Sequence, residues 1–200
     1  MRCIIVLLNA LLFVSVPSYA QQKVEVQDVA HHPFTVDFPS GDRLDLDIRS
    51  GEIHIIGSDE EKVAVRISGS QGANSTDVKA RFRRSGNSGE LRITGGPHNE
   101  LTITVQVPKN SDLFLRVLAG EVAVTGITGN KDIELHFGDL KVGVGDPTDY
   151  ANVQASVNFG EIEAKPFGES RGGLFRSFKK SGTGKYKLVA HVGAGELTLD

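Results

Sequence analysis

The side chains best suited to chemistry in this sequence are carboxylates that recur one position after a glycine. Each pair lies between alternating apolar residues, a pattern that indicates strands on either side. If the segments that carry them stack on one another, the carboxylates form an outward column that offers oxygen ligands to a cation such as Ca²⁺. The five pairs are Gly51 and Glu52, Gly120 and Glu121, Gly138 and Asp139, Gly160 and Glu161, and Gly195 and Glu196.

A structural role accounts for these carboxylates more simply. A Glu or Asp beside a corner glycine accepts hydrogen bonds from corner amides or is solvated. Calcium-binding β-helix repeats use a denser Gly-Gly-x-Gly-x-Asp pattern, which this sequence lacks. We therefore assign the five glycine and acid pairs to structure, and we predict no metal site and no cofactor.

A polysaccharide-acting enzyme is the alternative that paired carboxylates allow. Glycosidases use two carboxylates that flank the scissile bond, and Asp139 with Glu161 is the pair to test. The histidines do not form a recognisable site, because His54, His136 and His191 take different positions relative to the glycines of their segments. Neither the metalloprotease motif His-Glu-x-x-His nor the nucleophile motif Gly-x-Ser-x-Gly occurs. The chain also has no Trp and only 3 Tyr to stack on sugar rings. We predict no catalytic residue and a protein that is not an enzyme.

A basic, glycine-rich segment at 168–187 is the strongest candidate for binding. Its sequence, GESRGGLFRSFKKSGTGKYK, holds six Lys or Arg residues against one acid, with apolar side chains interleaved. One interpretation is a mobile contact loop for an anionic partner such as a membrane surface or an acidic polysaccharide. The other is a loop whose aromatic residues cover the side or end of the core. The candidate binding residues are Arg171, Phe175, Arg176, Phe178, Lys179 and Lys180.

These side chains must be positioned by a repeated element. In five segments, apolar residues lie seven, five and three positions before the glycine and two and four positions after it. Glycine suits a corner between two strands because it tolerates a positive φ. The exceptions are Lys131 at minus seven and the small Ala155, Ala164 and Ala190, and a sixth, weaker copy surrounds Gly89. The five segments are residues 44–55, 113–124, 131–142, 153–164 and 188–199.

Two β architectures can use this corner. In a parallel β-helix each copy is one turn of a coil, and equivalent positions stack about 4.8 Å apart. In an antiparallel β-sandwich or meander each copy is a hairpin. The spacings of the last four glycines, 18, 22 and 35 residues, are closer to the length of a solenoid turn than to the strand spacing of a sandwich. We predict an all-β, single-domain β-solenoid like a right-handed parallel β-helix, with the sandwich or meander as the alternative.

The first 20 residues predict a signal peptide. Arg2 precedes an apolar run at 4–16, and the tripeptide SYA at 18–20 is a cleavage site of the small-x-Ala type. The apolar run is too short to span a bilayer, which takes about 20 residues. Because the one cysteine, Cys3, lies within this segment, a mature chain has no disulfide. We expect an exported protein that is periplasmic or extracellular.

The remainder divides into an N-terminal strand or cap segment, 21–43, and a repeat-built β domain, 44–200, with a basic insertion at 168–184. The formal net charge of -3 indicates no general attraction to nucleic acid. The last strand, GELTLD at 195–200, has little beyond it to cover its edge. An open strand edge pairs readily with another chain, so we expect self-association through this C-terminal strand.

The stretch 105–142, VQVPKNSDLFLRVLAGEVAVTGITGNKDIELHFGDLKV, carries a resemblance, together with VNFGEIEA and AHVGAGELTL downstream. It resembles the bacterial putative adhesin domain family, exported domains built from short strands that are punctuated by Gly-Asp or Gly-Glu. The resemblance implies a β-helix-like fold and an extracytoplasmic location, and it brings no catalytic residues. We predict an exported, non-enzymatic, adhesin-like binding or structural domain at the cell envelope, with a polysaccharide lyase or glycosidase as the alternative.

Overall fold

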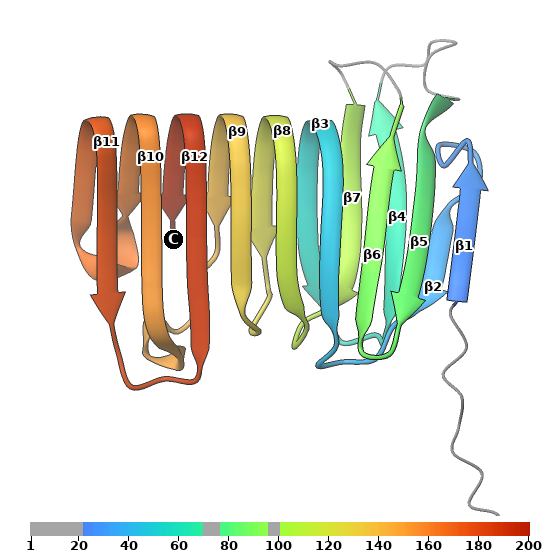
Figure 1. Cartoon of the computed structure of the whole chain (residues 1–200), viewed down its shortest axis with the longest axis horizontal. Coiled ribbons are helices and arrows are strands. Elements are labelled where there is room, and N and C mark those ends of the chain that lie inside the picture. Colours follow the sequence, from blue (N-terminus) through green and yellow to red (C-terminus); the bar gives the residue numbers. More distant parts are fainter. Residues whose placement is uncertain (1–21, 70–76, 96–100) are drawn as a thin grey trace, which may run out of the picture.

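The computed structural model describes residues 22–69, 77–95 and 101–200, and these residues form an all-β structure (Figure 1). The expected signal peptide, residues 1–20, lies outside the described residues. No described helix is long and apolar enough to cross a membrane. The strands are β1 (Gln22–Gln27), β2 (Phe34–Asp37), β3 (Arg43–Ser58), β4 (Lys62–Gly69), β5 (Lys79–Ser85), β6 (Ser88–Thr94), β7 (Leu101–Pro108), β8 (Asp112–Thr125), β9 (Lys131–Val142), β10 (Tyr150–Ala164), β11 (Glu169–Ser181) and β12 (Tyr186–Leu199).

Each of the five repeated segments lies in one long strand that bends over the upper edge of the molecule (Figure 1). These bent strands are β3, β8, β9, β10 and β12, and they pair with one another in parallel. The register matches the sequence repeat, since Gly51 lies opposite Gly120, and Gly120 lies opposite Gly138. The five motif glycines therefore form a single row along the bend.

The row of glycines is required by both conformation and space. Gly138 and Gly195 have φ values of 119° and 142°, which L side chains rarely adopt. A Cβ atom on Gly138 would lie 2.0 Å from the carbonyl oxygen of Gly120, and one on Gly195 would lie 1.9 Å from that of Gly138. Only glycine lets neighbouring strands turn over each other at this spacing.

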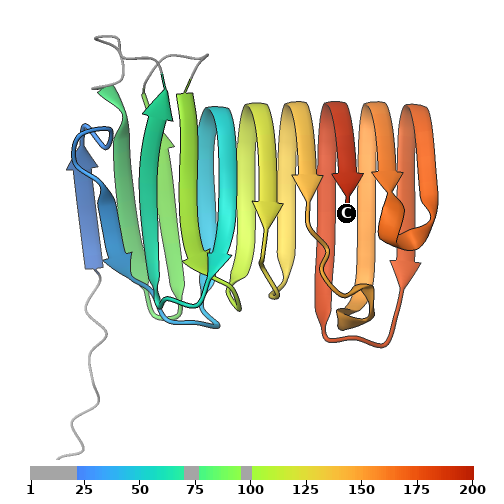
Figure 2. The same cartoon turned by 180° about the vertical axis from the view of Figure 1, so that it is seen from behind.

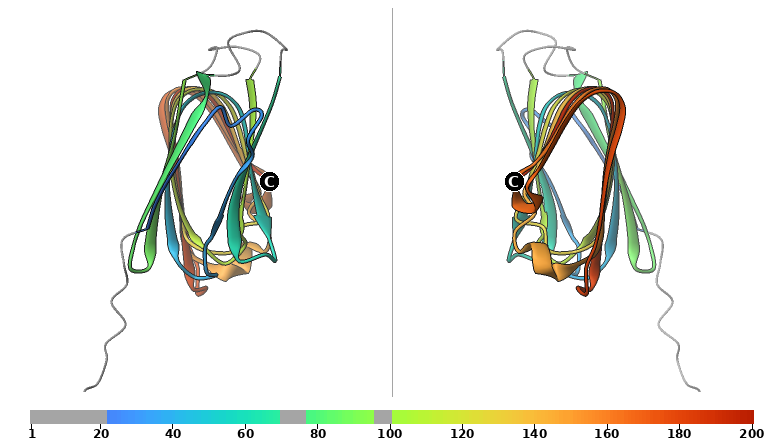
Figure 3. Two further views of the ribbon diagram at one scale, coloured as in Figure 1. Left: turned by 90° about the vertical axis from the view of Figure 1, so that its right-hand side faces the viewer. Right: turned by 90° about the vertical axis from the view of Figure 1, so that its left-hand side faces the viewer.

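The bend places the two halves of each strand in two facing layers with the apolar core between them (Figure 3). Beyond β3 the layers separate, because the first half of β3 pairs with β6 and its second half pairs with β7. One layer continues through β6, β5 and β1, and the other through β7, β4 and β2. These extensions beyond β6 and β7 are antiparallel (Figure 2).

The all-β prediction is confirmed, whereas the finer prediction of a β-solenoid is not. The sheet does not close, and the separate antiparallel extensions suit the sandwich or meander alternative. The prediction of a sixth, weaker copy of the repeat around Gly89 is wrong, because Gly89 pairs with Leu44 and not with Gly51. Gly89 is instead needed for packing, since a Cβ atom there would lie 2.7 Å from the Phe38 ring and 2.8 Å from the Phe82 ring.

The order of the strands in the sheet differs from their order in the chain. β12 lies between β9 and β10, and it pairs in parallel with both (Figure 1). The expected open edge at the C-terminal strand is therefore wrong, because both edges of β12 are occupied. The sheet ends at β11 on one side and at β1 and β2 on the other.

Candidate functional site

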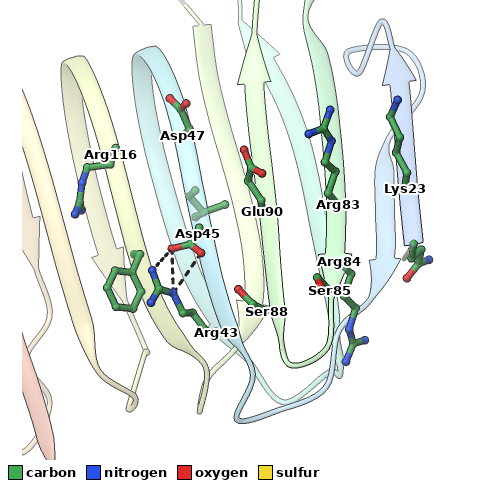
Figure 4. Close-up of a pocket in the computed structure, with 13 residues that line it drawn as sticks. Lys23, Arg43, Asp45, Asp47, Arg83, Arg84, Ser85, Ser88, Glu90 and Arg116 are labelled. Carbon is green, nitrogen blue, oxygen red and sulfur yellow. Dashed lines mark hydrogen bonds and ion pairs between the residues drawn. The ribbon is translucent and has the colours of Figure 1, made fainter. Parts of the chain in front are cut away.

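A groove of about 820 Å³ lies on the outer face of β1, β5, β6, β3 and β8 (Figure 4). Side chains on these strands alternate between the core and the groove, as in any strand with one buried face. The floor holds five cationic side chains and three carboxylates, although the whole chain has a net charge of -3. The charged residues are Lys23, Arg43, Arg83, Arg84 and Arg116, with Asp45, Asp47 and Glu90.

Toward the β8 side of the groove, Arg43 is fixed by a carboxylate and an aromatic ring (Figure 4). Its Nη2 atom lies 2.8 Å from Oδ1 of Asp45, and its guanidinium carbon lies 3.6 Å from the centroid of the Phe114 ring. The hydrogen bond to Asp45 raises the pKa of Arg43 above its usual value. Arg43 is therefore held in one orientation with its charge locally balanced.

Most other cations in and beside the groove also have acidic partners. Arg84 lies 2.6 Å from Asp42, and Arg92 lies 3.0 Å from Asp47. Both Asp132 and Glu134, on β9, accept from Arg116 at the edge of the groove, at 3.2 and 3.0 Å. These pairs form a row of alternating charge across the strands, a surface that offers both hydrogen-bond donors and acceptors.

Lys23 and Arg83 are different. They lie directly opposite each other on β1 and β5, and no ion pair between described residues involves either side chain, although Glu90 lies opposite Arg83 on β6. Ser85 and Ser88 add two hydroxyl groups to the same end of the groove. Two adjacent cations with nearby hydroxyl groups form a place for an anionic group of a ligand.

The outward column of carboxylates exists as the sequence predicts. Glu52 lies opposite Glu121, Glu121 lies opposite Asp139, and Glu196 lies opposite Glu161. Their partners are local: Thr102 and His54 bond to Glu52 and lower its pKa, while Asp139 accepts from the amide of Glu196 at 3.0 Å. Among the described residues, no group of three or more His, Asp or Glu side chains is placed to hold a metal ion.

The carboxylate pair considered for an enzyme is not a neighbouring pair. Because β12 lies between β9 and β10, Glu196 separates Asp139 from Glu161. The structure instead brings Ser156 and His191 together, with Oγ and Nδ1 2.9 Å apart on the outer face of β10 and β12. Sequence reasoning missed this contact because it depends on the exchanged strand order.

Two of the histidines discussed from the sequence contact acidic residues and not each other. His54 contacts Glu52, and His136 contacts Glu134. Each contact joins two residues that are two positions apart on one strand. The His54 contact and the His136 contact lie at different register positions of the sheet. The histidines are thus side chains of separate surface pairs.

The prediction of a loop is wrong for most of the basic segment, which forms the strand β11 at the end of the sheet and pairs along its length with β10. Arg171 and Arg176 lie opposite the buried Ile162 and Val157 of β10, so both face the open end of the core. Arg171 donates to the carbonyl of Ser177, and Arg176 donates to that of Gly172, at 2.9 Å each. Arg171 also forms an ion pair with Glu169 of the same strand, at 3.0 Å.

The aromatic residues of this segment have different roles. Phe178 is 3% exposed and packs against Phe167, with ring centroids 5.5 Å apart, whereas Phe175 is 73% exposed. Lys179 and Lys180 are exposed, and Lys180 lies opposite the buried Val153. Part of the predicted binding segment therefore covers the end of the core.

Sequence reasoning missed the groove, whose residues come from five strands between 22 and 116. A signal is present in the sequence, since charged residues alternate with apolar ones in RLDLDIR at 43–49 and KARFRRS at 79–85. Alternation identifies an outer face, but it does not say which strands lie side by side.

Comparison with known proteins supports the fold. No protein-family model matches the chain, and no curated protein matches it in sequence. A crystal structure described as "a putative cell adhesion protein" from Clostridium sporogenes has a TM-score of 0.50 and 12% identity, and the match covers 84% of this chain and 97% of that one. A "putative adhesin" from Bacteroides fragilis has a TM-score of 0.23 and 8% identity, over 92% of this chain and 99% of that one. The chain thus shares its fold with the bacterial protein from Clostridium sporogenes.

Proposed function

We propose that the protein is an exported, non-enzymatic, adhesin-like binding domain of the cell envelope that holds an acidic polysaccharide in the groove of Figure 4. The observation that carries this proposal is the pair of adjacent cations Lys23 and Arg83, neither of which takes part in an ion pair between described residues, at one end of a groove about 820 Å³ in volume. The likeness of the fold to the structure described as "a putative cell adhesion protein" is consistent with it.

The shape and chemistry of the groove favour an extended ligand rich in hydroxyl groups. Five strands about 4.8 Å apart give a floor roughly 19 Å long, which suits a chain better than a compact molecule. Lys23 and Arg83 bind a carboxylate or sulfate, while Ser88, Glu90 and Asp45 exchange hydrogen bonds with hydroxyl groups. Acidic polysaccharides combine both kinds of group.

The scaffold suits this role because it holds the floor rigidly. Two of the floor strands, β3 and β8, pair in parallel in register over the core, and β6, β5 and β1 continue the same layer as paired strands. Charged side chains on regular strands need little reordering when a ligand arrives, which reduces the entropy cost of binding.

The proposal is tested by titrating the mature domain with polygalacturonate and hyaluronan, and with neutral dextran as control, by isothermal calorimetry at low and high salt. We expect binding of an acidic polymer that weakens with salt and is at least about tenfold weaker in the double variant Lys23→Glu, Arg83→Glu. The matched control is Lys179→Glu, Lys180→Glu, which reverses two charges on β11 and should bind like the wild type.

Two results would overturn the proposal. If the β11 variant loses binding and the groove variant keeps it, the basic strand is the binding site and the groove is not. If neither acidic polymer binds the folded wild-type domain, the proposed ligand class is wrong. The same mixtures are examined for shortened polymer, because cleavage would support the enzyme alternative.

A further inference from the structure

β11 leaves one long edge of the sheet unpaired. It pairs with β10 alone, and no other strand of the described residues covers its outer edge (Figure 1). Every residue of β11 except Glu169 and Phe178 is exposed. A free edge of this length presents a row of backbone N–H and C=O groups that can accept a further strand.

The inward side chains of β11 decide which strand can be added. A strand that continues the bend must place its own inward residues opposite Arg171 and Arg176, as β10 does with Ile162 and Val157 on the other side. An apolar residue opposite either arginine costs little, whereas a cation is disfavoured, because Cβ atoms of directly opposite residues lie only about 5 Å apart and like charges there repel each other.

A second copy of β11 meets this difficulty in either direction. In an antiparallel pair with aligned bends, Arg171 of one copy lies opposite Arg176 of the other. In a parallel pair, Arg171, Arg176 and Lys180 each lie opposite themselves. Charge repulsion therefore disfavours pairing of β11 with a second copy of itself. A strand that carries carboxylates opposite Arg171 and Arg176 would instead be attracted.

The bend of β11 adds an apolar contact surface. Phe175 has a φ of 49°, which is unfavourable for a bulky side chain, and it holds its exposed ring against Phe159 with centroids 5.7 Å apart. Leu174 lies opposite Phe159 and is 61% exposed. Exposed apolar side chains gathered at the end of a sheet mark a surface that another molecule covers.

We propose that the free edge of β11 binds an extended acidic segment of another protein as an added, bent strand. The segment carries two carboxylates five residues apart, one for Arg171 and one for Arg176. Between them it needs a glycine at the bend, and an apolar residue beside that glycine contacts Leu174 and Phe175. Backbone hydrogen bonds provide affinity, and the two ion pairs provide specificity.

The test uses a peptide derived from β10, whose register against the other edge of β11 is known. The probe is a synthetic, fluorescently labelled copy of β10, Tyr150–Ala164, with Val157→Glu and Ile162→Glu, and the control is the unchanged sequence. We expect the acidic peptide to bind the full mature domain at least about tenfold more tightly in anisotropy titrations. Hydrogen exchange should slow at β11 amides and not at the groove strands.

Charge exchange separates this site from the groove. The variant Arg171→Glu, Arg176→Glu should lose the acidic peptide and bind a peptide with Val157→Lys and Ile162→Lys instead. The variant Lys23→Glu, Arg83→Glu should bind the acidic peptide unchanged. Equal binding of the acidic and unchanged peptides, or exchange protection outside β11, would overturn the proposal, whatever the groove binds.

Discussion

At the scale of single residues, Lys131 is the most unusual side chain of the core. The equivalent position holds Leu in β3, β8 and β12 and Val in β10. Lys131 is 1% exposed, and its Nζ donates to the hydroxyl of Tyr150, which in turn donates to the carbonyl of Val144 at 3.0 Å. Burial lowers the pKa of Lys131 to about 8 and raises that of Tyr150 to about 12.

The lowered pKa of Lys131 predicts a stability that rises with pH. Between pH 8 and 10 the unfolded chain keeps a lysine proton that the folded protein has lost, so the free energy of unfolding increases by on the order of 2–3 kcal/mol. Above pH 10 the raised pKa of Tyr150 acts in the opposite direction. Urea unfolding of Lys131→Met should show higher stability at pH 7 and a much flatter profile from pH 8 to 10.

A surface lysine provides the control for this experiment. Lys141 forms an exposed ion pair with Asp200 at 2.9 Å, so Lys141→Met should change stability little and keep the pH dependence. A wild-type profile that is flat between pH 8 and 10 would contradict the assignment of a titrating Lys131.

The corner glycines differ from glycines of ordinary loops. Gly138→Ala should destabilise the fold by at least about 3 kcal/mol, because the new Cβ would meet a backbone oxygen that cannot move away alone. Gly145 also has a positive φ, 75°, but no atom lies within 4 Å of its Cβ position. Gly145→Ala should therefore cost only about 1 kcal/mol in the same denaturant titration, and similar losses for both variants would contradict the role of the glycine row.

At the scale of elements, β11 combines a cap with a free edge. Phe178→Ala should cost about 3–4 kcal/mol, because it removes a buried ring that packs on Phe167. Phe175→Gly removes an exposed ring and relieves a left-handed backbone, so stability should stay equal or increase by up to about 1 kcal/mol. Thermal unfolding of the two variants compares these effects, and equal losses would mean that β11 does not cap the core.

The elements themselves were largely predictable from the sequence. The five bent strands follow the apolar positions around Gly51, Gly120, Gly138, Gly160 and Gly195, because side-chain direction alternates along a strand and only glycine fits the bend. The strand character of β11 was missed, because its inward positions carry Arg and Lys. A core-facing pattern disappears where a strand covers the end of the core instead of lying within it.

At the scale of the whole molecule, the neighbours of each strand could not be predicted. The five copies carry the same kinds of residue at core positions, so nothing in the pattern tells β12 to pair with β9 and β10. The groove was hidden for the same reason, since Lys23, Arg83 and Arg43 come together only after β1, β5, β6 and β3 are placed side by side. Periodicity specifies which face of a strand is buried, and tertiary packing specifies which strands meet.

The position of β12 also determines the order in which the molecule can fold. β9 and β10 follow each other in the chain, yet the sheet separates them by a strand that comes later than both. Until Tyr186–Leu199 has been made, β9 and β10 each carry an open edge, and pairing them directly would leave β12 without its place. A nascent chain therefore exposes unpaired edges on β9 and β10, which can pair with other chains until β12 inserts between them.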